Sequence, residues 1–217
     1  MTLIDLSQDI YDRMPRHPIL PEVEVSCLFR IAEGKPLNIS QLRIATHAGS
    51  HIDAPYHAFE HGRTIDQIPL DTFVGRGALI TVQRGGGEAI TAADLENSGV
   101  AVERGDILLI RTGWDARFTS PDYLMHPYLA EEACRWIVER GVKLVALDCL
   151  SPDLPVALRP PDFAYPAHRT LLGHDIPIIE NLCNFGALEG RRFRFIALPL
   201  RVRGGDAGHT RAVAELL

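Results

Sequence analysis

The chain has 217 residues, of which 46% are hydrophobic and 23% charged, a balance typical of globular rather than disordered proteins. This length is sufficient for one domain with a sizeable core, and we predict a single domain over residues 1–217. The formal net charge is -6, from 22 basic and 28 acidic residues. Because the sequence contains no block of lysines or arginines, neither nucleic acid nor an anionic membrane is an expected partner.

Cysteine usage and the N-terminal residues favour a cytoplasmic location. None of the four cysteines forms a Cys-x-x-Cys pair, and Cys134 and Cys149 stand in apolar segments, so we expect reduced core thiols. Asp5 and Asp9 interrupt the stretch in which a signal peptide has an apolar run. No segment approaches the roughly 18 apolar residues of a membrane span.

Hydrophobic patterning predicts a chain with more strands than helices. Apolar runs and alternation predict strands at residues 2–6, 23–31, 38–45, 78–82, 106–111, 142–147, 176–179 and 193–201, the last being the final strand. Helical periodicity predicts helices at 92–98, 129–140 and 167–172. The proline-rich segments 11–21 and 150–166 are expected to be irregular loops, and long irregular loops in compact domains are usually functional. The expected fold class is therefore mixed α/β and strand-rich.

Three histidines and an aspartate lie within eleven residues, all at odd positions: His47, His51, Asp53 and His57. In an extended chain these side chains point to one side. His51 and Asp53, about 6–7 Å apart along a strand, can converge on one ion, whereas His47 needs a bend, which Gly49 permits. Imidazole nitrogen and carboxylate oxygen together suit zinc, manganese or iron.

Two other interpretations of this stretch remain. A helix would place His47 and His51 four residues apart on one face, as in H-E-x-x-H enzymes, but the glutamate of that motif is absent. Gly49 and Pro55 also disfavour a helix. A polar loop with merely hydrogen-bonded histidines is the second alternative. Because the predicted strand 38–45 is expected to be buried and runs directly into the cluster, we favour a metal site at a strand end.

A site for two metal ions needs further ligands, and His168 and Glu180 are the best remaining candidates. Glu180 ends the apolar run 176–179, and a carboxylate at the end of a buried strand needs a partner such as a cation. His168 follows the proline-rich loop, although a surface helix histidine is an equally good interpretation of it. His174 lies in a turn that is expected to face solvent.

The segment from His47 to His57 resembles the H-x-G-[TS]-H-x-D-x-P-x-H signature of the cyclase family, which includes kynurenine formamidases and isatin hydrolases. The likeness extends over nearly the whole chain, through residues 65–75, 109–114, 148–153, 168–172, 178–182 and 197–205. It implies a mixed α/β domain with a β-barrel-like mixed sheet flanked by helices. It also implies a homodimer or homotetramer with zinc or manganese bound, two ions per chain.

The resemblance assigns roles to particular residues. It implies five metal ligands: His47, His51, Asp53, His168 and Glu180. The first three correspond to ligands of one ion, and Asp53 corresponds to a carboxylate that bridges to a second ion. His57 corresponds to the catalytic histidine, which accepts and donates a proton.

Two departures from the family pattern concern the substrate. His17 stands where the family often has a tryptophan in an M-P-x-W-P loop, and residues 208–210 read Gly-His-Thr where the family has a Gly-Ser-Pro turn. Arg16 and His17 would suit a carboxylate-bearing or polar substrate. Trp114 is expected to pack in the core and to line the substrate pocket.

The expected activity is metal-dependent hydrolysis of a C–N bond in a small amide, as in an arylformamidase. A divalent ion lowers the pKa of bound water from near 16 toward about 7 and so provides the nucleophile. His57 is placed to move the proton that the leaving nitrogen requires. The alternatives are a ring-opening hydrolase of a cyclic amide or lactone, and a non-catalytic metal-binding protein. The sequence contains neither a G-x-S-x-G elbow nor a P-loop.

Overall fold

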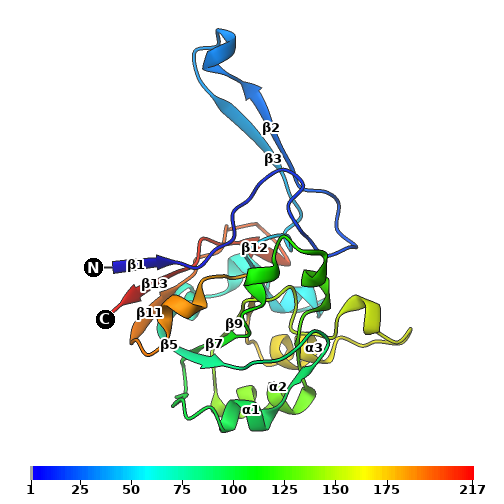
Figure 1. Ribbon diagram of the computed structural model, residues 1–217, viewed down its shortest axis with the longest axis vertical. Coiled ribbons are helices and arrows are strands. Elements are labelled where there is room, and N and C mark those ends of the chain that lie inside the picture. Colours follow the sequence, from blue (N-terminus) through cyan, green and yellow to red (C-terminus); the bar gives the residue numbers. More distant parts are fainter. Residues whose placement is uncertain (1) are drawn as a thin grey trace.

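A nine-stranded mixed sheet forms the centre of the computed structural model, which describes residues 2–217 (Figure 1). Its strands are β1 (Thr2–Asp5), β4 (His51–Asp53), β5 (Val74–Thr81), β7 (Ile107–Arg111), β9 (Leu144–Leu147), β10 (Ile178–Glu180), β11 (Phe193–Ile196), β12 (Ala207–His209) and β13 (Val213–Leu216). The spatial order is β1-β13-β11-β5-β7-β9-β10-β4-β12. The four central strands β5, β7, β9 and β10 are parallel, and the flanking pairs are antiparallel.

Each central strand contributes to two apolar cores, because successive side chains point to opposite faces of the sheet. Leu108 and Ile110 of β7 pack into the core on the helix side, whereas Ile107 and Leu109 pack into the second core. Burial on both faces accounts for the continuous apolar runs that identified β7 and β9 in the sequence.

The sheet curls, because the chain that follows β1 meets the chain that follows β10. The Leu6 N–H donates to the Ala212 carbonyl at 3.0 Å, and the Cys183 N–H donates to the Leu6 carbonyl at 2.8 Å. Ser7 and Leu182 form an antiparallel bridge. These contacts join the two halves of the strand order, so the sheet forms part of a barrel. The expected strand-rich α/β fold with a barrel-like sheet is confirmed.

Short helices cover one face of the sheet (Figure 1). The α-helices are α1 (Ala92–Glu96), α2 (Glu131–Arg140) and α3 (Pro166–Gly173). Thr91 caps α1 by accepting the Asp94 N–H at 3.2 Å, and α2 ends at Gly141, whose φ of 69° is left-handed. Between residues 2 and 217, no helix combines the length and apolar character that crossing a bilayer requires.

The remaining elements are small. They are a parallel pair, β6 (Ala89–Ile90) with β8 (Tyr128–Leu129), and the 3-10 helices η1 (Ile31–Glu33), η2 (Pro55–His57), η3 (Ile65–Gln67), η4 (Leu70–Phe73), η5 (Trp114–Arg117), η6 (Pro121–Met125), η7 (Val156–Leu158) and η8 (Phe185–Leu188). The proline-rich segments 11–21 and 150–166 contain no β-strand, and η7 is the sole helix within them before α3 begins. The four cysteines are free, and Cys134 and Cys149 are buried as expected.

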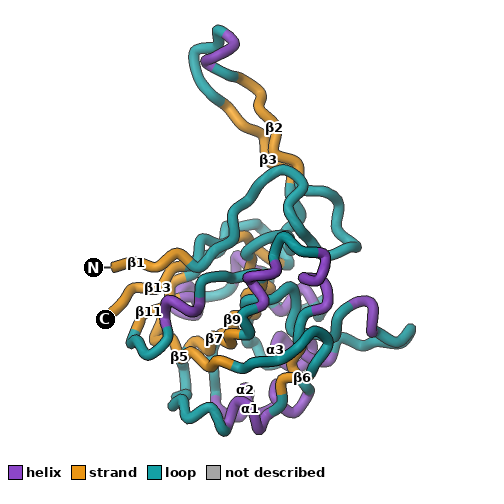
Figure 2. Tube along the Cα trace, in the orientation of Figure 1, coloured by secondary structure: helices purple, strands orange, loops and turns teal. Residues whose placement is uncertain are grey.

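A β-hairpin projects from the body of the molecule (Figures 1 and 2). It consists of β2 (Glu24–Phe29) and β3 (Ile39–Arg43), and we call residues 24–43 the arm. Six large apolar side chains of the arm are exposed: Leu28, Phe29, Ile31, Leu37, Ile39 and Leu42. This arm has no core of its own.

Two sequence predictions are wrong at these elements. The predicted strand 38–45 exists as β3 (Ile39–Arg43), but every residue of β3 is exposed because this strand lies in the projecting arm rather than on the body. The predicted final strand 193–201 ends at Ile196, and β12 and β13 follow it. Pro199 lacks the N–H that a strand ladder needs, so the segment beyond Ile196 cannot continue pairing regularly.

Candidate metal centre

Strand β4 places two of the expected ligands on one face of the sheet. His51 and Asp53 are two residues apart in an extended segment, so both side chains point away from the core that holds Ile52. Glu180 of β10 pairs with His51 in the antiparallel register, which brings its carboxylate to the same face. All three side chains are buried.

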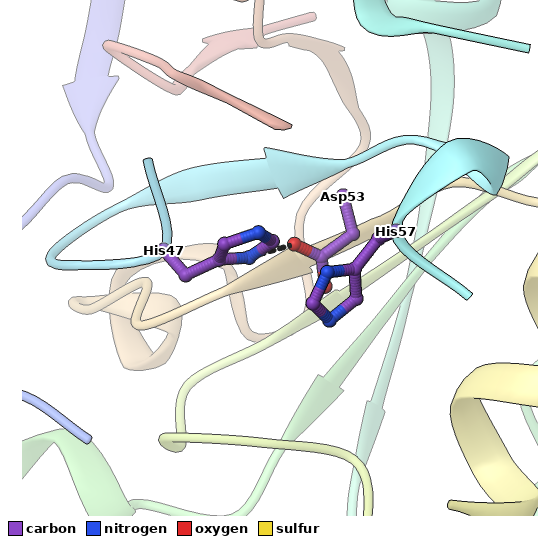
Figure 3. Close-up of side chains that lie close together, drawn as sticks. All are labelled: His47, Asp53 and His57. Atoms are coloured by element: carbon purple, nitrogen blue, oxygen red, sulfur yellow. Dashed lines mark ion pairs between the residues drawn. The ribbon is translucent and has the colours of Figure 1, made fainter. Parts of the chain in front are cut away.

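The chain bends before β4, as expected at Gly49, but the chain after β4 is not extended, which differs from the sequence expectation. Gly49 adopts a left-handed φ of 69°, and the resulting bend folds His47 back toward β4. The His47 Nδ1 lies 2.8 Å from Asp53 Oδ1 (Figure 3). Pro55 opens the 3-10 helix η2 instead, because its fixed φ suits a first helical position, and η2 presents His57 beside Asp53.

The five expected ligands converge on the Asp53 carboxylate. His51 Nε2 lies 3.2 Å from Asp53 Oδ1 and 3.5 Å from Glu180 Oε2. His168 Nε2 lies 3.5 Å from Asp53 Oδ2 and 3.3 Å from Glu180 Oε1. Asp53 therefore presents one oxygen to His47 and His51 and the other oxygen to His168, as a bridging carboxylate does.

Hydrogen bonds at Nδ1 set the orientation of the His51 and His168 rings. The His51 Nδ1–H donates to the Gly49 carbonyl at 2.8 Å, and the His168 Nδ1–H donates to Asp153 Oδ2 at 2.6 Å. This arrangement directs each Nε2 toward the carboxylates. Metal-binding histidines are held in this way by carbonyl or carboxylate partners.

His47 has a comparable partner in Asp206, which precedes β12. The His47 Nε2 lies 3.0 Å from Asp206 Oδ2, and the Thr46 hydroxyl donates to Asp206 Oδ1 at 3.1 Å. Asp206 and Asp153 escaped the sequence analysis. Asp153 lies within the proline-rich loop and Asp206 follows two glycines, but no spacing rule links either aspartate to its histidine.

The cluster fits a divalent cation. Four of the seven buried side-chain atoms that lack a hydrogen-bond partner within the described chain belong to this cluster: His51 Nε2, both carboxylate oxygens of Asp53, and Glu180 Oε1. Buried carboxylates without partners are costly, and a cation among them removes that cost. Imidazole nitrogen with carboxylate oxygen is the donor set that zinc and manganese accept.

Burial and the charges of neighbouring side chains together shift the pKa values of the cluster. Burial raises the pKa of Glu180, and the charge of Asp53 adds to this increase. Burial would also raise the pKa of Asp53, but the charges of His47 and His51 hold it well below its usual value. Burial opposes charge on His168, yet its hydrogen bond to Asp153 and the nearby carboxylates of Asp53 and Glu180 raise its pKa well above normal.

The pKa of His57 shifts in the opposite direction from that of His168. Its ring centroid lies 4.0 Å from that of His47 and 5.4 Å from that of His168. Although part of the residue is exposed, loss of solvent around the ring lowers the pKa of His57 to about 4, despite the opposing charge of Asp53. A neutral imidazole at pH 7 can accept a proton.

A cavity of about 370 Å³ opens onto the cluster. His47, His168 and Glu180 line it together with His57, and His17 also lines it as the sequence analysis expected. The walls are mostly apolar. The size and lining match those of small-molecule sites.

Arg16 and Trp114 do not line this cavity. The Arg16 Nε–H donates to the Leu20 carbonyl at 3.0 Å, which holds the side chain within its own loop. Trp114 is buried as a core residue, and its indole N–H donates to the Tyr123 carbonyl at 3.0 Å. Arg159 and Arg169 line the cavity instead, and the sequence analysis did not identify them.

The chain matches known proteins over nearly its full length. The model of the Cyclase family, described as "Putative cyclase", matches residues 4–154. A kynurenine formamidase from Erythrobacter litoralis is 33% identical over 214 residues, which cover 98% of this chain and 93% of the relative.

Solved structures show the same architecture. Isatin hydrolase A from Ralstonia solanacearum superposes with a TM-score of 0.88 at 23% identity, covering 98% of this chain and 91% of that one. A protein described as a potential metal-dependent hydrolase with cyclase activity has a TM-score of 0.76 at 27% identity, covering 98% and 96%. From the family model and the formamidase relative it follows that the chain belongs to the cyclase family.

Proposed function

We propose that this protein is a metal-dependent hydrolase that cleaves the C–N bond of a small amide, with formamides as the first substrates to test. One observation supports this most strongly. Three histidines and two buried carboxylates converge at an open cavity, and several of their atoms lack hydrogen-bond partners. The similarity to kynurenine formamidases supports an amide as the substrate.

The ligand assignment is part of this proposal. His47, His51 and Asp53 would hold one ion, and Asp53 with His168 and Glu180 would hold a second. Zinc and manganese are the expected metals, because both accept mixed nitrogen and oxygen ligands. The two oxygens of Asp53 face different histidines, His47 at Oδ1 and His168 at Oδ2, which supports two positions rather than one.

The side chains would divide the remaining work. When bound, a divalent ion supplies Lewis acidity and lowers the pKa of water toward about 7. His57 stands at the same cavity as a neutral base, so a ring nitrogen can accept a proton and return it to the leaving nitrogen. Because the His51 and Asp53 side chains are buried, their positions would stay fixed during the reaction.

The first prediction tests His57. We expect His57→Ala to retain its metal content and to lose about 10²–10⁴-fold in turnover of formanilide, because a proton-transfer group contributes that much. Metal analysis and initial rates are measured on the same zinc- or manganese-supplemented sample. His61→Ala is the matched control, since His61 is exposed and lies outside the cavity. Unchanged turnover would contradict the proton-transfer role.

A loss of metal in His57→Ala would have a different meaning. Ligand atoms of His47, Asp53 and His57 all lie within 4.8 Å of one another, so His57 could complete a metal site. Metal loss would therefore place His57 among the ligands.

A panel of formamides, cyclic amides and lactones separates amide hydrolysis from ring opening. Bound metal without turnover on any of them would favour a non-catalytic metal-binding protein.

We further propose that residues 1–217 act as one domain in the cytoplasm, and that the chain forms a homodimer or homotetramer. The nine-stranded sheet, which includes both β1 and β13, supports one domain. Four free cysteines suit a reducing compartment. The exposed apolar side chains of the arm support self-association. The expected partner is a small amide, and the negative net charge argues against nucleic acid.

A further inference from the structure

Two arginines line the cavity without a carboxylate partner from the chain. Arg159 comes from the proline-rich loop and Arg169 from α3. Within residues 2–217, neither guanidinium forms an ion pair. Arg169 lies over the Phe59 ring, 5.0 Å from its centroid, and is exposed at the rim.

Arg159 is held in a fixed orientation. Its Nε–H donates to the Leu154 carbonyl at 2.7 Å. The guanidinium carbon lies 5.0 Å from the centre of the Phe163 ring and 4.9 Å from that of the Tyr165 ring. Neither terminal nitrogen has a hydrogen-bond partner among the described residues. A planar guanidinium with both terminal groups free matches the two oxygens of a carboxylate.

The charges of the cavity indicate what this guanidinium faces. The carboxylates of Asp53 and Glu180 are directed toward the histidine cluster, and Asp153 is bonded to His168. None is available to neutralise Arg159. The half-buried guanidinium therefore keeps its positive charge available to attract an anion that enters the cavity. The cavity wall around it includes the apolar residue Leu150, which would accommodate an apolar fragment.

We propose that Arg159 is a specificity-determining residue that binds a carboxylate on the substrate, with Arg169 adding positive charge at the rim. The substrate class is then an amide whose amine fragment bears a carboxylate across an apolar or aromatic spacer. This inference rests on the proposed amide hydrolysis. A structural interpretation competes with it, because the hydrogen bond from Arg159 to the Leu154 carbonyl also stabilises the loop internally.

Matched pairs of substrates distinguish the two interpretations. The probes are 2-, 3- and 4-formamidobenzoate and the corresponding uncharged formamidobenzamides, assayed with the metal-supplemented full chain. We expect the best benzoate isomer to exceed its amide by about 10–100-fold in kcat/KM, the range expected for charge-assisted hydrogen bonds. Arg159→Gln should abolish this preference, mainly through KM, and leave the benzamides within about 3-fold.

Two further variants sharpen the result. Arg159→Lys keeps the charge but loses the paired geometry, so it should restore only part of the preference. Arg191→Gln is the matched control, because Arg191 is exposed and lies outside the cavity. If Arg159→Gln slows benzoates and benzamides equally, Arg159 has only the structural role and the proposal is overturned.

Binding of unreactive ligands separates this proposal from the proposed activity. Calorimetric titration of the metal-loaded protein with benzoate and benzamide should show a benzoate affinity about 10-fold weaker in Arg159→Gln, since one charge-assisted hydrogen bond is worth at least that factor. Absence of turnover with an Arg159-dependent benzoate affinity would refute amide hydrolysis and support the anion site. Equal benzoate affinity in both proteins would refute the anion site.

Discussion

Asp153 shows how one residue can organise both a helix and a metal ligand. Its Oδ1 accepts the Ala167 N–H at 2.9 Å in the first turn of α3, and its Oδ2 accepts the His168 Nδ1–H at 2.6 Å. Carboxylates favour helix N-termini because the free N–H groups there are donors. The same carboxylate therefore starts α3 and directs His168 Nε2 toward Asp53.

We expect Asp153→Asn to weaken zinc binding by about 10–100-fold, because the neutral amide no longer holds the His168 ring and its proton as firmly. The amide oxygen can still accept the Ala167 N–H, so the fold should persist. Competition with a chromogenic chelator measures the affinity, and circular dichroism verifies the fold. Asp122→Asn, at an exposed aspartate paired with Arg117, is the control. Equal zinc affinities would contradict the assigned role.

At the residue scale, the sequence predicts side chains that share a short segment and fails where partners are distant. Spacing and family resemblance placed His51 and Asp53 together because a strand fixes their separation. The partner of His47 is Asp206, which is 159 positions away, and no local pattern encodes that contact. Arg159 was missed for a similar reason, since a loop without periodicity gives no direction to its side chains.

The elements around β4 control where His57 lies. Helix η2 begins at Pro55 and ends at His57, and the chain returns against it at Gly62. A Cβ on Gly62 would lie 2.5 Å from the Pro55 carbonyl carbon and 2.7 Å from the Tyr56 nitrogen. Backbone atoms cannot move aside as the end of a flexible side chain can. Only glycine therefore allows residue 62 to pack this closely against η2, and this packing holds η2 in place.

We therefore expect Gly62→Ala to shift η2 and to lower turnover by about 10²-fold, the effect of a displacement near 1 Å. Zinc affinity should change little, because the β4 ligands and His168 lie outside η2. Unfolding midpoints and zinc titrations accompany the rate measurements. Loss of zinc together with activity would mean that the substitution disturbs β4 rather than η2.

At the element scale, hydrophobic patterning located the buried parallel strands and the helices near their observed bounds. It failed at β12, which has only the residues Ala207–His209 and no apolar alternation. It also assigned β3 a buried face, because alternation along a strand is the same whether the apolar face meets a core of its own chain or another surface. Burial is a property of the whole fold.

At the scale of the whole molecule, the arm stands out because the rest of the chain does not bury its large apolar side chains. A two-stranded hairpin alone is marginally stable in water, and this one exposes six large apolar side chains. Exposed apolar area of this kind indicates an interaction surface. In the proposed homodimer or homotetramer, the partner of the arm is a second copy of the chain. The arms of two copies would then bury the same side chains against each other by symmetry.

We expect the triple substitution of Leu28, Ile31 and Leu37 to serine to convert the assembly to a 24.0 kDa monomer, measured by sedimentation equilibrium. Burying each side chain contributes roughly 1.5 kcal/mol or more, so their joint loss weakens association on the order of 10³-fold. Leu70→Ser is the control, because Leu70 is equally exposed but lies on the body. A monomeric wild-type protein would contradict the assembly, whereas an unchanged oligomer in the triple variant would place its interface outside the arm.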